Sequence, residues 1–224
     1  MSSVVLGMDA SGFHGRTDVN VVIDPVARSC IWVPRDLWSP CTAERINVAF
    51  KKGSHALVRA ALKEHGLAVD HSLCFSRVAI ERCLEHVRVT VPVPVRMEFD
   101  YPLRPGAPIE EGSKRIEFTP PEEHLSRERI HQWIGARSAP EGQWRGGDLD
   151  RIDRQKTFVR CILEQNADLS PVFNDPALYD CTNLDFVVDE LEQVTPEWSL
   201  RMFYPMLCRR VVDGKDVLVN PSCT

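Results

Sequence analysis

The stretch that decides the fold is VVLGMDASGFHGRTDVNVVIDPVARSCIWVPRD, residues 4–36. It holds three short apolar runs, at residues 4–8, 19–23 and 29–33, and β-branched residues dominate the second. Runs of this length and composition predict buried β-strands. Asp24-Pro25 is a turn signal between the second and third runs, so these two strands are expected to pair antiparallel. The stretch therefore predicts a three-stranded meander.

Charged residues stand where these predicted strands begin and end. Asp9 ends the first strand, Asp18 precedes the second, and Arg35 follows the third. In an antiparallel meander all three positions meet at one edge of the sheet. Two neighbouring carboxylates repel each other unless a proton or a cation lies between them, and carboxylate oxygens are ligands that Mg²⁺ prefers. The pattern predicts a Mg²⁺ site at this edge, although the same residues could also be two loop caps and a surface arginine.

Beyond the meander, helices and strands alternate along the chain. Periodicity, caps and turn residues predict helices over 54–65, 77–85, 126–136, 150–169 and 184–193, and strands over 69–75, 87–95, 114–118, 201–204 and 217–219. The Pro- and Gly-rich residues 97–113 are expected to form a long loop. This mixture predicts an α/β fold with helices on a mixed sheet. We expect residues 1–169 to form the catalytic core, with residues 170–224 packed on the same domain.

The helix predicted from residue 150 carries a second set of polar residues. Arg151 and Gln155 share a helical stripe with Phe158 and face inward, whereas Arg154 is expected to point outward or to flank that stripe. A buried arginine needs an anionic partner, and the start of a helix favours phosphate. Arg151 and Gln155 are therefore candidate phosphate ligands, and an internal salt bridge from Arg151 to a carboxylate is the alternative.

Composition excludes several classes of protein. The net charge of -5 offers no field that attracts nucleic acid. The eight cysteines form no CxxC pair, so a structural zinc site is not expected. No apolar run is long enough to span a bilayer, and the first residues are not a signal peptide. We therefore expect a cytoplasmic protein without a transmembrane anchor, or an extracytoplasmic one if the chain is a piece of a longer protein. The oligomeric state stays open.

Seven motifs in order carry a family resemblance. They are Gly7-Met8-Asp9, Arg16-Thr17-Asp18, Pro34-Arg35-Asp36, Arg45-Ile46-Asn47, Asp70-His71, Arg137 and the run from Asp148 to Gln155. Together they resemble the LytR-CpsA-Psr family of phosphotransferases. The resemblance implies a three-layer α/β/α sandwich around a mixed central sheet. It also implies a polyprenyl pyrophosphate whose diphosphate is bound by arginines and Mg²⁺, and the transfer of a linked group to a hydroxyl acceptor or hydrolysis of the pyrophosphate.

The resemblance also assigns roles to individual residues. Asp9 and Asp18 are the implied metal ligands. Arg16, Arg35, Arg137, Arg151 and Gln155 are the implied ligands of the substrate diphosphate. Asp9, Asp18, Arg35 and Arg151 are the implied catalytic residues, and Mg²⁺ is the implied cofactor. The predicted function is that of a Mg²⁺-dependent phosphotransferase or pyrophosphatase that acts on a prenyl or polyprenyl pyrophosphate.

Two departures from the family pattern leave alternatives open. Gly135 stands where the family usually has an arginine, and Arg145 in a nearby insertion could replace it. The family is usually anchored in the membrane, whereas this chain starts at its first strand. One alternative is a cytosolic biosynthetic enzyme that hydrolyses, ionises or cyclises a soluble prenyl pyrophosphate. Another is a non-catalytic protein that binds a lipid diphosphate.

Overall fold

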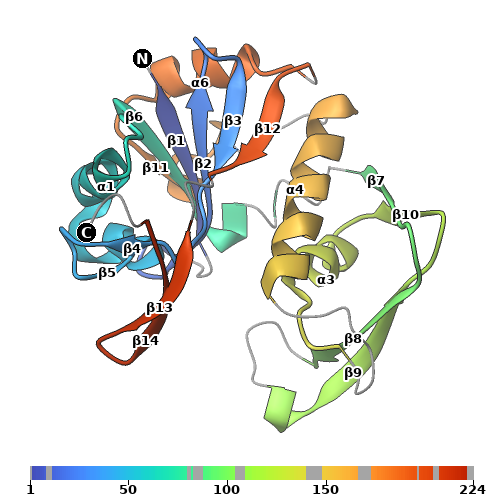
Figure 1. The fold of residues 1–224 in the computed structure, drawn as a ribbon. Helices are drawn as coiled ribbons and strands as arrows, with labels where there is room; N and C mark the ends of the chain where they lie inside the picture. The colour runs from blue at the N-terminus through green and yellow to red at the C-terminus, as the bar shows by residue number, and fades with distance from the viewer. Residues whose placement is uncertain are drawn as a thin grey trace. The chain divides into compact units, whose positions relative to one another are not determined.

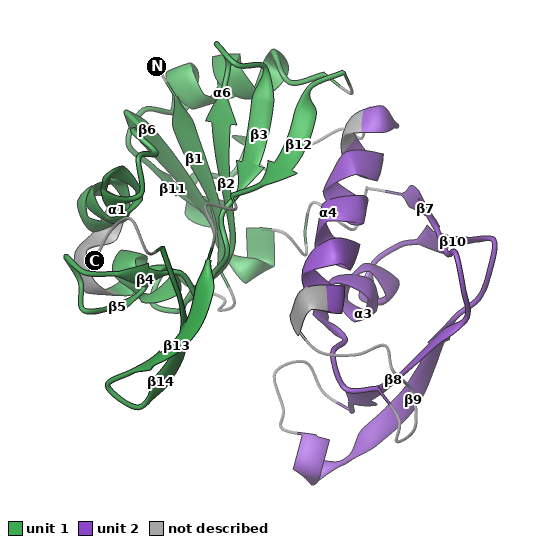
Figure 2. Cartoon of the chain, in the orientation of Figure 1, with its two compact units in different colours: residues 1–82, 170–224 green, residues 83–169 purple. Residues whose placement is uncertain are grey.

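The structure is a computed structural model that describes most of the 224 residues. It describes residues 2–8, 12–79, 82, 88–103, 109–139, 148–165, 173–195, 197–203 and 207–220, without the side chains of residues 52–54, 148–149 and 163. The chain divides into two compact units (Figure 2). Unit 1 comprises residues 1–82 and 170–224, and unit 2 comprises residues 83–169.

A six-stranded mixed sheet forms the centre of unit 1 (Figure 1). Its strands, in spatial order, are β11 (Tyr179–Cys181), β6 (His71–Phe75), β1 (Ser3–Met8), β2 (Thr17–Asp24), β3 (Ser29–Trp32) and β12 (Ser199–Met202). β1, β2 and β3 pair antiparallel in sequence order, which confirms the predicted meander. β6 pairs parallel with β1, and β12 pairs parallel with β3. The edge strand β11 pairs antiparallel with β6.

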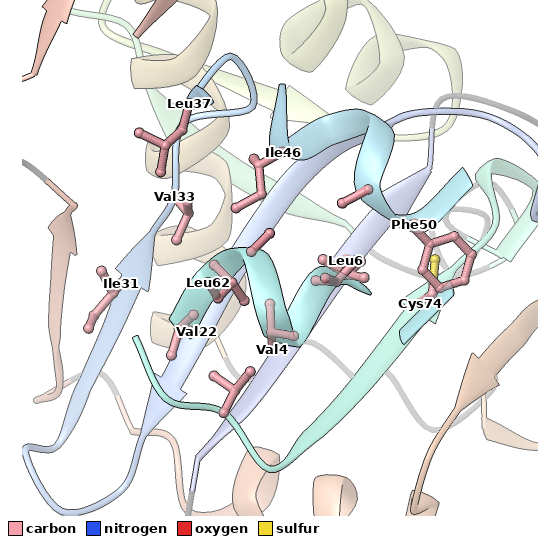
Figure 3. Close-up of a cluster of buried hydrophobic side chains, with 14 of the residues drawn as sticks. Val4, Leu6, Val22, Ile31, Val33, Leu37, Ile46, Phe50, Leu62 and Cys74 are labelled. Carbon is pink, nitrogen blue, oxygen red and sulfur yellow. The ribbon is translucent and has the colours of Figure 1, made fainter. Parts of the chain in front are cut away.

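Helices pack on both faces of this sheet. α1 (Ile46–Glu64) covers one face, where its apolar residues pack with Val4 and Leu6 of β1 and with Cys74 of β6 (Figure 3). α6 (Leu184–Glu192) lies against the other face, where the ring of Phe186 packs 4.4 Å from that of His71. Residues alternate between the two faces along each strand, so each strand supplies both layers. The α/β fold with a mixed central sheet is therefore confirmed.

Smaller elements of unit 1 lie between β3 and α1 and near the end of the chain. They are β4 (Trp38–Ser39), β5 (Glu44–Arg45), the 3₁₀ helix η2 (Pro176–Leu178), β13 (Cys208–Val212) and β14 (Lys215–Val219). β4 pairs with β5, and β13 pairs with β14 as a hairpin. A parallel bridge joins Leu37 to Leu218, so the hairpin contacts the segment that follows β3.

The described part of unit 2 contains two antiparallel strand pairs and two α-helices. Its elements are β7 (Val89–Pro92), β8 (Met97–Pro102), the 3₁₀ helix η1 (Ile109–Glu111), β9 (Ser113–Phe118), β10 (Glu122–Leu125), α3 (Glu128–Gly135) and α4 (Asp148–Glu164). β7 pairs with β10, and β8 pairs with β9. Trp133 of α3 is 1% exposed and packs edge-to-face on Phe118, so aromatic residues form the core of this unit.

Several predicted boundaries differ from the structure, and two of them differ most. The helix expected from Ser54 begins earlier, at Ile46. Part of the loop expected over residues 97–113 is instead strand β8, whose Met97 and Phe99 are buried opposite Phe118 and Ile116. Residues 170–224 belong to the same compact unit as residues 1–82. The predicted division into a catalytic core of residues 1–169 and a C-terminal part stays a prediction. Among the helices that the structure describes, none has the length and apolar character needed to cross a membrane.

Candidate functional site

The meander brings Asp18 and Arg35 into direct contact in unit 1. Asp18 lies near the start of β2, and Arg35 follows β3 after Pro34. The Arg35 guanidinium donates from Nη1 to Oδ1 of Asp18 in a short ion pair. The side chain of Asp18 is 26% exposed and that of Arg35 is 14% exposed, so both stay within reach of a ligand. The predicted meeting of these two residues at one sheet edge is confirmed.

Two more charged residues extend this contact into an alternating series. Oδ1 of Asp36 lies 3.8 Å from Nε of Arg35 and 3.5 Å from Nε of Arg45. The series therefore runs Asp18, Arg35, Asp36, Arg45, with an acid on either side of Arg35. The Arg35 guanidinium therefore lies between two carboxylates, with a hydrogen bond to Asp18 and a longer ion-pair contact to Asp36.

The backbone between β3 and α1 connects this series to the start of a helix. The N–H of Asn47 donates to the carbonyl of Arg35 at 3.1 Å, and the N–H of Ile46 donates to that of Leu37 at 2.7 Å. These bonds satisfy N–H groups that open the first turn of α1. This arrangement explains why the helix begins at Ile46, where no side chain caps it.

Two buried amides adjoin the same segment. The side chain of Asn47 is fully buried, and neither amide atom has a hydrogen-bond partner among the described residues. Nδ2 of Asn20, on β2, also lacks one there, while the carbonyl of Asn20 accepts from Val33 N–H. Buried polar groups are normally hydrogen-bonded, so each such group calls for an explanation, such as water or a ligand. Neither amide was predicted to have a role, although Asn20 does interrupt an otherwise β-branched strand.

The structure does not test the predicted roles of Asp9 and Arg16, the other two residues of this sheet edge. Asp9 lies outside the described residues, so its predicted role as a metal ligand stays a prediction. Arg16 is exposed and immediately precedes β2. Its predicted contact with a diphosphate likewise stays a prediction.

In unit 2, α4 carries Arg151 and Gln155 as predicted from its periodicity. Both residues are buried, at 4% and 6% exposure, and Nε2 of Gln155 donates to the carbonyl of Ile134 at 3.0 Å. Arg137 is exposed and follows the end of α3. The inward orientation of Arg151 and Gln155 is confirmed, whereas their binding of a diphosphate is untested.

Arg154 differs from its prediction because the structure buries it. It is 5% exposed, Nε donates to the Trp133 carbonyl at 2.9 Å, Nη2 donates to the Ala136 carbonyl, and the guanidinium stacks 4.4 Å from the Phe99 ring. Burial lowers the pKa of Arg154 to about 10, against the opposing effect of Asp150. Two of its nitrogens donate to backbone carbonyls, so Arg154 connects α4 to the C-terminal end of α3.

Most of the sequence matches a family model. The sequence model of the LytR_cpsA_psr family matches residues 1–191. This chain belongs to the LytR-CpsA-Psr family. The family that the ordered motifs predicted is therefore confirmed. A sequence search of curated proteins finds no significant match to this LytR-CpsA-Psr chain.

Solved structures share the fold of this LytR-CpsA-Psr protein at low sequence identity. TagV of B. subtilis has 15% identity and a TM-score of 0.67 over 99% of this chain and 91% of its own. A protein of Enterococcus faecalis, named as a transcriptional regulator, has 14% identity and a TM-score of 0.68 over 100% of this chain and 82% of its own. YwtF (TagT) with bound octaprenyl pyrophosphate lipid has 15% identity and a TM-score of 0.63 over 99% of this chain and 84% of its own. At such identities the likeness establishes the fold.

Among the described residues, Asp18 carries a carboxylate at the predicted magnesium site. Its carboxylate is a hard oxygen ligand and is partly open to solvent. Within the described ranges, no three His, Cys, Asp or Glu side chains gather as a cage for a metal ion. Mg²⁺ usually keeps several waters and takes one or two carboxylates plus substrate phosphate oxygens. Asp18 therefore fits a magnesium ion that depends on substrate oxygens for much of its coordination.

Proposed function

We propose that this protein is a Mg²⁺-dependent phosphotransferase or pyrophosphatase that acts on a prenyl or polyprenyl pyrophosphate. The observation that carries the proposal is the contact between Asp18 and Arg35 at the sheet edge of a LytR-CpsA-Psr fold. A carboxylate and an arginine held together in this way supply a cation ligand and a phosphate ligand side by side. The solved YwtF (TagT) with bound octaprenyl pyrophosphate lipid supports this substrate class.

The proposed roles follow from the charge of each group. The proposed ligands of the diphosphate oxygens are Arg16, Arg35, Arg137, Arg151 and Gln155. Arginine suits this task because its planar fork donates two parallel hydrogen bonds to a phosphate. Asp18, together with Asp9, holds Mg²⁺, which supplies charge neutralisation at the phosphate oxygens.

Phosphoryl transfer depends on positioning and charge more than on covalent chemistry by the protein. The arginines stabilise the charge that develops on the leaving phosphate as its bond to the transferred phosphoryl group breaks. Asp36, which lies between Arg35 and Arg45, is a candidate to accept the proton of the attacking hydroxyl or water. The acceptor decides whether the outcome is transfer or hydrolysis.

The test is turnover of a panel of prenyl pyrophosphates, octaprenyl pyrophosphate included, with Mg²⁺ and with products identified by mass spectrometry. Asp18→Asn and Arg151→Met should each lower turnover by about 100-fold or more, the usual cost of removing one charge-stabilising group. Arg160→Met changes an exposed arginine of the same helix α4 and should keep wild-type turnover. Undiminished activity in both site variants would refute the assignment.

The same variants test whether the two sets of residues act on one ligand. If they do, the combined Asp18→Asn and Arg151→Met variant should lose less than the product of the two single losses, because groups that act as a unit are not additive. Losses that multiply would argue that the residues act independently. A protein that binds the pyrophosphate but never turns it over would be a binding protein, and the enzyme proposal would fail.

A further inference from the structure

The β13–β14 hairpin lies beyond the part of the chain that matches the family, which ends at residue 191. It nevertheless contacts the segment that carries Arg35. The N–H of Leu218 donates to the carbonyl of Asp36 at 2.9 Å, and Leu37 and Leu218 form a parallel bridge. β14 therefore pairs with the residues that directly follow Arg35 in the chain.

Arg45 connects the same hairpin to the charged series. Its Nε and Nη2 donate to the main-chain carbonyl of Asp216 at 3.1 and 2.7 Å. Its Nε also lies 3.5 Å from Oδ1 of Asp36. One guanidinium thus contacts β14 and the carboxylate beside Arg35 together. A lysine has a single nitrogen on a flexible stem and cannot reproduce this fixed set of contacts.

An ion pair also joins the hairpin to Glu44, the residue before Arg45. Nζ of Lys215 lies 2.6 Å from Oε1 of Glu44, and the two side chains are 39% and 19% exposed. An exposed pair contributes little to stability by itself. Together with the Arg45 and Leu218 contacts, however, it holds β14 against the segment from Arg35 to Arg45 at several points.

We propose that the β13–β14 hairpin is a positioning element for the candidate site, and that Arg45 is its principal positioning residue. The hairpin holds Asp36 and the backbone after β3, and through them it sets the direction of the Arg35 guanidinium toward Asp18. This inference rests on the proposed function only for its effect on turnover. Its structural part, the coupling of the hairpin to Arg35, stands apart from any substrate.

The experiment follows the Nε–H resonance of Arg35 by ¹⁵N NMR, assigned by its loss in Arg35→Lys, next to turnover of the best prenyl pyrophosphate. Arg45→Lys and Lys215→Glu should each shift the Arg35 resonance. They should also lower kcat by about 10- to 100-fold, as expected when a reacting group is misplaced by about 1 Å. Arg210→Gln changes an exposed arginine of the same hairpin and should alter neither measurement.

Reversal of the ion pair separates positioning from a general loss of structure. Glu44→Lys combined with Lys215→Glu restores opposite charges and should return both the Arg35 resonance and kcat toward wild type. The inference is overturned if the Arg35 resonance stays in place in Arg45→Lys and in Lys215→Glu, or if the reversed pair recovers nothing. If the wild type turns over no prenyl pyrophosphate, the proposed function fails, and the NMR measurement alone still decides the coupling.

Discussion

Gly135 stands where the family resemblance predicts an arginine, and the structure leaves room for a side chain there. It is the last residue of α3, and a Cβ would meet only the Tyr101 side chain, at 3.7–3.8 Å, which is ordinary van der Waals contact. We expect Gly135→Arg to fold normally and to bind Mg²⁺-pyrophosphate about tenfold more tightly, because it adds a charge-assisted hydrogen bond. Calorimetric titration measures this change.

Gly135→Gln is the matched control, since it adds a side chain of similar length without charge. Both variants should melt at or slightly above the wild-type temperature, because glycine inside a helix costs about 0.5–1 kcal/mol relative to alanine. Equal affinity in the arginine and glutamine variants would show that position 135 does not contribute to pyrophosphate binding here.

Glu190 is a buried carboxyl on α6 and is 3% exposed. Burial raises its pKa above the ordinary value of 4.5, although the Ser3 hydroxyl and His71 lower it and Asp70 adds to the rise. The folded state therefore favours the protonated form. The stability that this group contributes is complete below the unfolded-state pKa and is lost as pH rises through the folded-state pKa.

We therefore expect Glu190→Gln to melt higher than the wild type near pH 8 and at a similar temperature near pH 4. The neutral amide has the shape of the protonated carboxyl and no charge to bury. Thermal melts across this range provide the measurement. A difference in Tm that is constant with pH would show that Glu190 does not titrate in the way that its burial implies.

Residue by residue, the sequence predicts the parts of the site that depend on local pattern. Asp18 and Arg35 were found because strand ends in a meander must meet, and Arg151 because a helical stripe has a fixed period. Arg154 was expected to point outward or to flank the stripe. A periodic pattern carries no information about the carbonyls of Trp133 and Ala136, which the Arg154 guanidinium contacts. Arg45 and Asn47 belong to one of the seven family motifs. The groups that they contact, however, belong to residues distant in the chain, such as Asp216 for Arg45 and Arg35 for Asn47.

At the level of single elements, boundaries were predicted less well than the elements themselves. α1 begins at Ile46 because carbonyls of Arg35 and Leu37 accept its first N–H groups, which no local capping pattern reveals. β8 was expected to be loop because Pro and Gly surround it, whereas cross-strand packing of Phe99 near Phe118 stabilises it. In contrast, α6 was predicted nearly to its limits because its cap lies in the local sequence.

That cap permits a direct test. The side chain of Asn183 accepts a hydrogen bond from the N–H of Phe186 at 3.2 Å at the start of α6. Asn183→Ala should lower stability by about 1 kcal/mol, which corresponds to a fall in Tm of about 2–4 °C for a domain of this size. Asn183→Asp keeps an acceptor and should melt close to the wild type. Equal losses in both variants would argue that the amide acts by some contact other than the cap.

For the whole molecule, the order of motifs was enough to predict the family and the α/β fold. It was not enough to predict the two compact units. The motif residues of unit 2 follow those of unit 1 in the chain. No local sequence pattern in residues 170–224 indicates that this segment packs with residues 1–82. Such pairing depends on long-range strand contacts, such as β12 with β3, which sequence periodicity does not encode.

Unit 1 is built from both ends of the chain, so it cannot be completed until synthesis on the ribosome is almost finished. Residues 83–169 are complete before the last strands of unit 1 have been synthesised. Until residues 179–181 and 199–202 are translated, β6 and β3 lack their outer partners. Exposed strand edges are templates for unwanted pairing. Nascent chains halted before residue 179 should therefore aggregate or recruit chaperones more readily than chains released at full length.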